Sequence, residues 1–195
     1  TTLVPLALLD EAWLSGKKIL MLEPRRIATK SAAHRMASLI NESPGQTVGY
    51  RMRLDTKVSK QTRIEVMTEG ILTRMLQKDP SLEEVGLVIF DEFHERNLDS
   101  DLALSLCLKG RTLFRDDQAP LKILIMSATL DSQAIAQLLD NAPIVSSEGK
   151  SYPVDINYGR ASQPKERIVD RMVTTIKQAL IDNPQSSLLT FLPGQ

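Results

Sequence analysis

Residues 85–96 read VGLVIFDEFHER, an apolar run that ends in a dense group of charged and titratable side chains. Residues 85–90 are all apolar or glycine, a composition typical of a strand buried on both faces of a parallel sheet. Asp91 and Glu92 follow this run directly. Adjacent carboxylates at such a strand end can hold a divalent cation and polarise a water molecule, although surface strands also end in carboxylates that only face solvent.

Similar apolar runs alternate along the chain with segments of helical periodicity. Strands are expected at residues 18–22, 87–90 and 123–126, with weaker candidates at 47–50 and 63–67. Helices are expected at residues 4–14, 27–40, 70–77, 99–113 and 132–139, and Asp99 and Asp131 stand where N-caps would be. This alternation predicts a doubly wound α/β domain with a mainly parallel sheet, whose ligand site lies beyond the carboxyl ends of the strands.

A change of composition after Asn141 divides the chain. Residues 143–145 are expected to form the last strand of a first domain spanning residues 1–145, and the polar residues 146–151 a linker. Residues 152–195 then predict a strand at 152–158, a helix from about 165 to 181 and a strand at 188–192. About 45 residues cannot bury enough surface to fold alone, so this segment is interpreted as the N-terminal part of a second α/β domain, truncated in this chain.

Composition and charge indicate a globular protein without a membrane span. Hydrophobic residues make up 42% and charged residues 25% of the chain, and neither a bilayer-spanning run nor a signal-peptide pattern is present. The single cysteine, Cys107, cannot form an internal disulfide, so a reducing, cytoplasmic setting is expected. Formal net charge is zero, but residues 17–35 and 51–63 are basic and residues 91–101 acidic. Such a separation of charge would allow the protein to bind a polyanion on one surface and a metal ion on another. Alternatively, these charged residues only lie on solvated helix faces.

Hydroxyl residues stand at two places where they could join the carboxylates. Ser127-Ala128-Thr129 ends another apolar strand, so its hydroxyls could lie beside His94 and Glu92, unless they only cap the following turn. Thr1-Thr2 precedes a helix, as does the hydroxyl residue of a phosphate-binding G-x-x-x-x-G-K-[ST] loop, which is a magnesium ligand. The glycines and lysine of that loop would then precede the first residue of the chain.

Two further strand ends carry groups that can bind phosphate. Pro24-Arg25-Arg26 follows the strand at 18–22 and begins a helix, so two guanidinium groups join the free N–H groups of the helix N-terminus. Thr68-Glu69-Gly70 repeats this arrangement after the strand at 63–67. Each tripeptide could also serve only as a helix cap.

Taken in order, these motifs resemble those of superfamily 2 helicases of the DEAH/RHA group. Pro24-Arg25-Arg26 is similar to motif Ia, Thr68-Glu69-Gly70 to Ib, Asp91-Glu92-Phe93-His94 to II, Ser127-Ala128-Thr129 to III and Phe191-Leu192-Pro193-Gly194 to the start of IV. Residues 48–51, 62–65, 68–76 and 91–96 further resemble the bacterial HrpB-type helicases. The wider group has alanine at the third position of motif II, where this sequence has Phe93, a difference that also points to the HrpB-type proteins. We expect Phe93 to alter packing only. The resemblance implies a RecA-like P-loop NTPase fold for residues 1–145, followed by the start of a second RecA-like domain.

The resemblance also implies a motor, driven by ATP or another NTP, that moves along single-stranded nucleic acid, most often RNA. It assigns nucleotide binding to Thr1, Thr2, Asp91 and Glu92, with Thr1 and Asp91 as Mg²⁺ ligands, the latter through water. Glu92 would activate the attacking water, while His94, Ser127 and Thr129 would couple hydrolysis to domain motion. Nucleic-acid binding is assigned to Pro24, Arg25, Arg26, Arg51, Thr68, Glu69 and Gly70.

Two departures from the family pattern bear on activity. The P-loop glycines and lysine are absent before Thr1, and the chain ends before the motifs that supply the arginine finger, so we expect these 195 residues alone to hydrolyse ATP poorly or not at all. Two other functions stay open: a non-catalytic RecA-like binding or scaffold domain, and another P-loop ATPase such as a transporter or recombinase motor. The intact Asp91-Glu92 pair opposes the first, and the paired arginines with Ser-Ala-Thr oppose the second.

Overall fold

The computed structural model describes residues 1–115, 120–128, 132–147, 149, 152–161 and 166–192. The chain falls into two compact units, Thr1–Val145 and Ser146–Gln195, and each is described by itself. None of the helices within the described ranges combines the length and the apolarity that crossing a bilayer requires.

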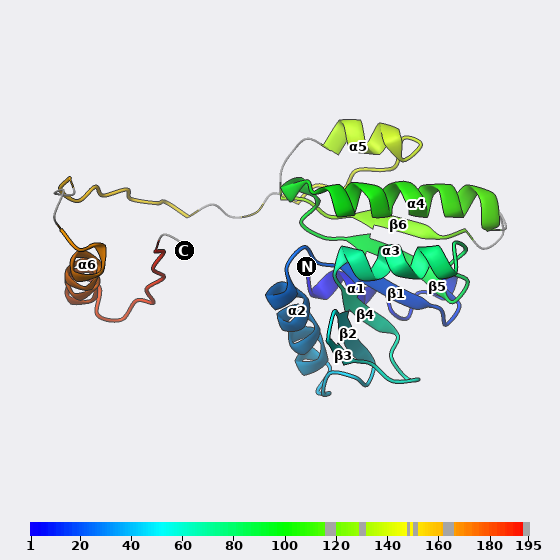
Figure 1. Ribbon diagram of the computed structural model, residues 1–195, viewed down its shortest axis with the longest axis horizontal. Coiled ribbons are helices and arrows are strands. Elements are labelled where there is room, and N and C mark those ends of the chain that lie inside the picture. The colour runs from blue at the N-terminus through cyan, green and yellow to red at the C-terminus, as the bar shows by residue number, and fades with distance from the viewer. Residues whose placement is uncertain (116–119, 129–131, 148, 150–151, 162–165, 193–195) are drawn as a thin grey trace. The chain divides into compact units, whose positions relative to one another are not determined.

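The described residues of the first unit build a six-stranded sheet with the order β3-β2-β4-β1-β5-β6 (Figure 1). Neighbouring strands run parallel, except that β2 and β3 are antiparallel. The strands are β1 (Lys18–Leu22), β2 (Val48–Met52), β3 (Asp55–Lys57), β4 (Ile64–Met67), β5 (Val85–Phe90) and β6 (Lys122–Ile125). The mainly parallel, helix-flanked sheet that the sequence predicts is confirmed.

Helices cover both faces of the sheet because successive strand residues point to opposite sides. In β1, Ile19 and Met21 join one buried cluster with α1 and α2, whereas Leu20 and Leu22 join another with α3 and α4. The helical elements of this unit are α1 (Leu3–Ala7), α2 (Arg26–Leu39), α3 (Glu69–Lys78), α4 (Leu98–Phe114), α5 (Ser132–Leu138) and the 3₁₀ turns η1 (Ala12–Leu14) and η2 (Phe93–Glu95).

The helix expected at residues 4–14 is interrupted. α1 ends at Ala7, and η1 forms a separate turn before β1. The Arg63 guanidinium donates to the Leu9 carbonyl, with Nη2 and the oxygen 2.6 Å apart. This carbonyl therefore accepts from the side chain of the residue before β4 instead of from an amide further along a helix.

The N-cap of α4 is Asn97, so the prediction of Asp99 for this position is wrong. The Asn97 side-chain oxygen accepts a hydrogen bond from the Ser100 amide at 2.8 Å, which fixes the helix start at Leu98. Asp131, predicted to cap the next helix, lies outside the described residues.

The described residues of the second unit contain the helix α6 (Ile168–Asp182), which confirms the helix predicted from about 165 to 181. The strands predicted at 152–158 and 188–192 are wrong for this structure, as is the one at 143–145 in the first unit. A strand is completed by hydrogen bonds to a neighbour, and the described residues offer no such neighbour to these segments. Their apolar pattern alone does not create a sheet.

Candidate functional site

The carboxyl ends of neighbouring strands meet at one edge of the sheet, and backbone hydrogen bonds continue past the strands there. The bonds run from an amide to a carbonyl on the adjacent segment: Glu23 to Met67 (3.0 Å), Asp91 to Leu22 (3.1 Å) and Met126 to Phe90 (2.8 Å). The segments that begin with Thr68, Glu23, Asp91 and Ser127 therefore stand in a row, at the edge where ligands of parallel sheets bind.

Asp91 follows β5 directly and is only 8% exposed. Its Oδ1 accepts a hydrogen bond from the Glu92 amide at 2.9 Å. Its Oδ2 is buried and has no hydrogen-bond partner among the residues that the structure describes. An unpaired buried carboxylate oxygen is costly unless a cation or water binds it, and Mg²⁺ prefers oxygen ligands of this kind. The donor set at Asp91 is therefore compatible with the predicted magnesium ion.

Glu23 is a buried acid of this site that the sequence-based reasoning missed. It follows β1 and is 3% exposed. Burial, together with the neighbouring Asp91 and Glu92 carboxylates, raises the pKa of Glu23 from 4.5 to about 8. The strand register is the signal that finds it: Leu22 pairs with Phe90, so the residues that follow the two strands become neighbours.

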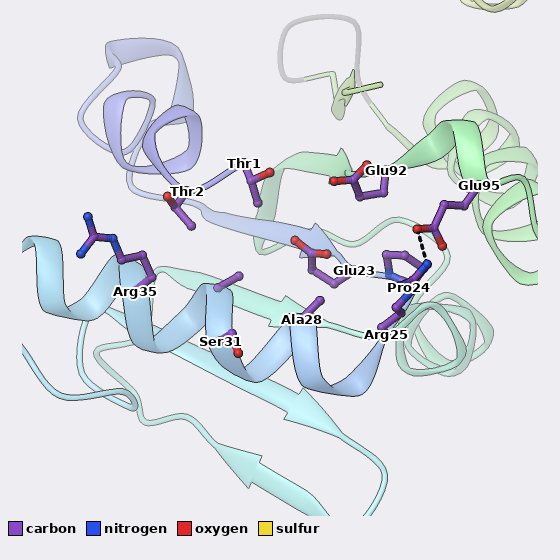
Figure 2. Close-up of a pocket in the computed structure, with 11 residues that line it drawn as sticks. Thr1, Thr2, Glu23, Pro24, Arg25, Ala28, Ser31, Arg35, Glu92 and Glu95 are labelled. Carbon is purple, nitrogen blue, oxygen red and sulfur yellow. Dashed lines mark hydrogen bonds and ion pairs between the residues drawn. The ribbon is translucent and has the colours of Figure 1, made fainter. Parts of the chain in front are cut away.

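An open pocket of about 430 Å³ lies between this edge, α2 and the first residues of the chain. Figure 2 shows the side chains of Thr1, Glu23 and Glu92 around the same space. The structure thus brings the predicted metal-binding hydroxyl and the predicted water-activating carboxylate together, in a volume typical of small-molecule sites. The lining residues are Thr1, Thr2, Glu23, Pro24, Arg25, Ala28, Ser31, Ala32, Arg35, Glu92 and Glu95.

A short turn carries Glu92 away from the strand. Glu92 has a left-handed backbone conformation with φ 50°, and η2 follows at once. Phe93 is buried and packs edge-on against Phe90, with ring centroids 6.0 Å apart. The Phe93 amide donates to the Met126 carbonyl at 3.2 Å. Phe93 therefore anchors the turn in the core while Glu92 faces the pocket.

His94 joins this turn to the segment after β6. Its Nδ1 accepts a hydrogen bond from the Ala128 amide at 3.3 Å and lies 3.5 Å from Glu92 Oε2. One nitrogen cannot accept from the amide and donate to the carboxylate at the same time, and the amide bond requires Nδ1 without a proton. His94 Nδ1 therefore contacts this segment through the main-chain amide of Ala128. Ser127 is exposed beside it, and Thr129 lies outside the described residues.

The two arginines of the Pro24-Arg25-Arg26 segment have different partners. Arg25 Nη2 lies 2.8 Å from Glu95 Oε1 at the rim of the pocket (Figure 2). Arg26 Nη2 donates to the Arg53 carbonyl at 3.2 Å. Both arginines are exposed at the start of α2, and Pro24 is half-buried. A guanidinium has five N–H donors, so these contacts leave donors for an anion.

Arg51 of β2 contacts a buried acid instead of the pocket. Its Nε lies 2.5 Å from Glu65 Oε2, and Lys18 Nζ lies 2.8 Å from Glu65 Oε1. Burial acts to raise the pKa of Glu65, but the hydrogen bonds and charges of Arg51 and Lys18 together outweigh it and hold that pKa below its ordinary value. The structure does not bring Arg51 to the pocket, and its contact with nucleic acid stays a prediction.

Thr68, Glu69 and Gly70 begin α3. Glu69 is buried, and its Oε1 accepts hydrogen bonds from Asn97 Nδ2 at 3.1 Å and from Ser100 Oγ at 2.9 Å. This carboxylate therefore ties the N-terminus of α3 to that of α4. Thr68 stands at the N-cap position without a side-chain cap bond, and Gly70 is exposed.

Comparison with known proteins places the chain in a family. The sequence profile of the DEAD/DEAH box helicase family matches residues 1–138, a range that holds Thr1, Asp91 and Ser127. The chain belongs to the DEAD/DEAH box helicase family. The resemblance inferred from the order of the motifs is confirmed, and so is the RecA-like fold that it implied.

This helicase chain is similar over its whole length to longer relatives. It is 50% identical over 194 residues to the ATP-dependent RNA helicase HrpB of Escherichia coli strain K12 and covers 23% of that protein. It is 36% identical over 196 residues to the pre-mRNA-splicing factor ATP-dependent RNA helicase prp22 of Schizosaccharomyces pombe and covers 16% of it.

Solved structures support the same assignment. The crystal structure of the Escherichia coli DEAH/RHA helicase HrpB matches all of this chain with a TM-score of 0.87 at 50% identity, over 24% of its own length. The HrpB-type resemblance is therefore confirmed. The helicase chain spans about a quarter or less of the length of the relatives described here.

Proposed function

We propose that this chain belongs to the motor core of an ATP-dependent RNA helicase that couples hydrolysis of ATP, or another NTP, to movement along single-stranded RNA. Residues 1–145 would belong to the first RecA-like domain, 146–151 to a linker and 152–195 to the second RecA-like domain. The names of the relatives, which are ATP-dependent RNA helicases, support the choice of ATP and RNA. We also propose a reducing, cytoplasmic setting, because Cys107 is a buried free thiol.

The observation that carries the proposal is the buried Oδ2 of Asp91, which has no hydrogen-bond partner among the described residues and precedes Glu92, whose side chain lines the pocket. Thr1, and Asp91 through water, would hold Mg²⁺ here, and Thr2 would line the nucleotide site. When bound, the ion would supply positive charge that offsets the phosphates and the carboxylates. Glu92 would orient the attacking water and accept its proton, since its carboxylate lines the pocket from the turn after β5.

His94 would transmit the state of Glu92 to the segment after β6. Its Nδ1 accepts from the Ala128 amide and lies 3.5 Å from Glu92 Oε2, so a shift of the Glu92 carboxylate would disturb the contact with the neighbouring strand end. Ser127 and Thr129 complete this proposed coupling set. The hydrogen bond from the Ala128 amide to His94 is sensitive to position because it requires a narrow range of distances and angles.

The nucleic-acid strand would lie along the N-termini of α2 and α3. Pro24, Arg25 and Arg26 precede or begin α2, and Thr68-Glu69-Gly70 begins α3, so helix amides, hydroxyl and guanidinium groups are available to phosphates there. Such contacts do not read bases. Binding is therefore expected to depend little on sequence and to weaken as salt concentration rises.

The test compares ATP hydrolysis by the full-length protein with that of Glu92→Gln, with and without single-stranded RNA. We expect RNA to stimulate the wild type, and the variant to lose at least about 100-fold in kcat while still binding nucleotide, because glutamine cannot accept the proton. Glu11→Gln, an exposed acid outside the pocket, is the control. Equal rates for wild type and Glu92→Gln would refute the role of Glu92. Nucleotide binding without turnover in the wild type would favour a non-catalytic RecA-like domain.

A further inference from the structure

An ion pair joins the two functional motifs on either side of the pocket. Arg25, at the start of α2, and Glu95, in η2, approach to 2.8 Å between Nη2 and Oε1 although they are 70 residues apart in sequence. Figure 2 shows this contact at the rim of the space that Glu92 faces. A group proposed to bind phosphate is thus paired with an acid from the turn that carries the proposed water-activating residue.

Glu95 is mechanically connected to Glu92. The Glu95 amide donates to the Glu92 carbonyl at 2.9 Å, closing the turn. Positive φ values bound the turn, 50° at Glu92 and 40° at Arg96, and side chains with a Cβ atom disfavour this backbone region. Contacts must therefore hold the turn in this conformation. Buried Phe93 holds its middle, Arg25 pairs with Glu95, and Arg96 at the outer end pairs with Asp101 at 2.9 Å.

The ion pair is suited to exchange with a stronger anion. The Arg25 side chain is 72% exposed and that of Glu95 33% exposed, so water screens their attraction. A phosphate group offers a guanidinium several oxygens and can form paired, charge-assisted hydrogen bonds. A strand placed along the N-terminus of α2 would therefore compete with Glu95 for Arg25.

We propose that Glu95 is a positioning residue that reports the occupancy of Arg25 by nucleic acid to Glu92. Without nucleic acid, Arg25 holds Glu95 and the turn keeps the conformation described above. When a phosphate takes Arg25, Glu95 is released, the outer end of the turn relaxes, and Glu92 reaches its working position. This inference rests on the proposed function and gives a physical route by which RNA stimulates hydrolysis.

The experiment uses the full-length protein and the variants Glu95→Gln and Glu95→Asp, with Glu11→Gln as an exposed control. Affinity for a fluorescent oligouridylate and the rates of ATP hydrolysis with and without it are measured. Glu95→Gln removes the competing charge, so we expect RNA to bind up to about fivefold more tightly, which corresponds to the strength of an exposed ion pair. The RNA-free rate should rise and the stimulation by RNA should fall, while Glu95→Asp should behave more like the wild type.

Two outcomes would overturn the proposal, and they are distinguishable. If the wild type is stimulated by RNA but Glu95→Gln has the same RNA affinity, basal rate and stimulation, Glu95 has no reporting role while the helicase function stands. If RNA does not stimulate the wild type at all, the proposed function fails and this inference fails with it. Combining Arg25→Ala with Glu95→Gln checks the pathway, because the effect of Glu95→Gln on the basal rate should be absent when Arg25 is already removed.

Discussion

Replacing Glu23 with glutamine is expected to change how the stability of the protein depends on pH. The Glu23 carboxyl has an ordinary pKa of 4.5, which burial and the neighbouring acids raise to about 8 in the folded state. Between these values the folded protein keeps a proton that the unfolded chain has lost. Stability is therefore greatest, as far as Glu23 is concerned, below pH 4.5, and it falls as the pH rises toward about 8.

The magnitude follows from the gap between the two pKa values. At about 1.4 kcal/mol for each pH unit, the gap amounts to about 5 kcal/mol. Relaxation of the surroundings lowers this value, so we expect the unfolding free energy to fall by about 2–5 kcal/mol between pH 5 and pH 9 because of Glu23. Glutamine has nearly the same shape and cannot ionise. Glu23→Gln should therefore equal or fall below the wild type in stability at pH 5 and exceed it at pH 9.

The assay is urea unfolding of both proteins at several pH values in the presence of EDTA, since a bound cation would favour the ionised carboxyl. The difference between the two unfolding free energies isolates the one group that differs. Glu11→Gln, at an exposed position, should show no pH-dependent difference. A difference between Glu23→Gln and wild type that stays constant from pH 5 to pH 9 would refute the raised pKa and the close approach of the carboxyls.

Three further predictions concern packing and burial. Gly110→Ala should destabilise the fold by about 1–3 kcal/mol in thermal unfolding, because a Cβ there would stand 2.3 Å from the Pro80 carbonyl oxygen, whereas Gly70→Ala, with open space at its Cβ, should be neutral or stabilising. Glu65→Gln should cost about 2 kcal/mol in denaturant unfolding, since it leaves two cationic partners without their buried counter-charge, and an unchanged midpoint would contradict this. Burial raises the pKa of the Cys107 thiol to about 12, so iodoacetamide at pH 8 should label it only after unfolding, and rapid labelling of the folded protein would show that the thiol is accessible.

The parts of the fold that depend on burial alone could be predicted from the sequence. Strands β1 and β5 are buried on both faces and therefore read as apolar runs. β3 was missed because Asp55–Lys57 is polar and largely exposed, and only its pairing with β2 makes it a strand. After residue 151 strands were predicted that the described residues do not contain. An apolar pattern indicates which side chains can be buried, but a strand also requires a neighbouring strand to pair with.

Only part of the candidate site could be predicted from the sequence. The gathering of motifs at one edge was predictable because the carboxyl ends of parallel strands share an edge. The place of Glu23 beside Asp91 depends on the register of β1 against β5, which includes an irregularity near Lys18. The Arg51–Glu65 and Arg25–Glu95 pairs join residues 14 and 70 positions apart, so no local sequence pattern predicts these contacts.

The left-handed backbone at Glu92 sets stability against activity at a single position. A residue with a Cβ atom at φ 50° is less stable there than glycine by about 1 kcal/mol. Substitution by glycine would relieve this conformation and would also delete the carboxylate proposed to activate water. A screen that selects thermostable variants without an activity filter will therefore enrich changes at residue 92, and its most stable products will include inactive proteins.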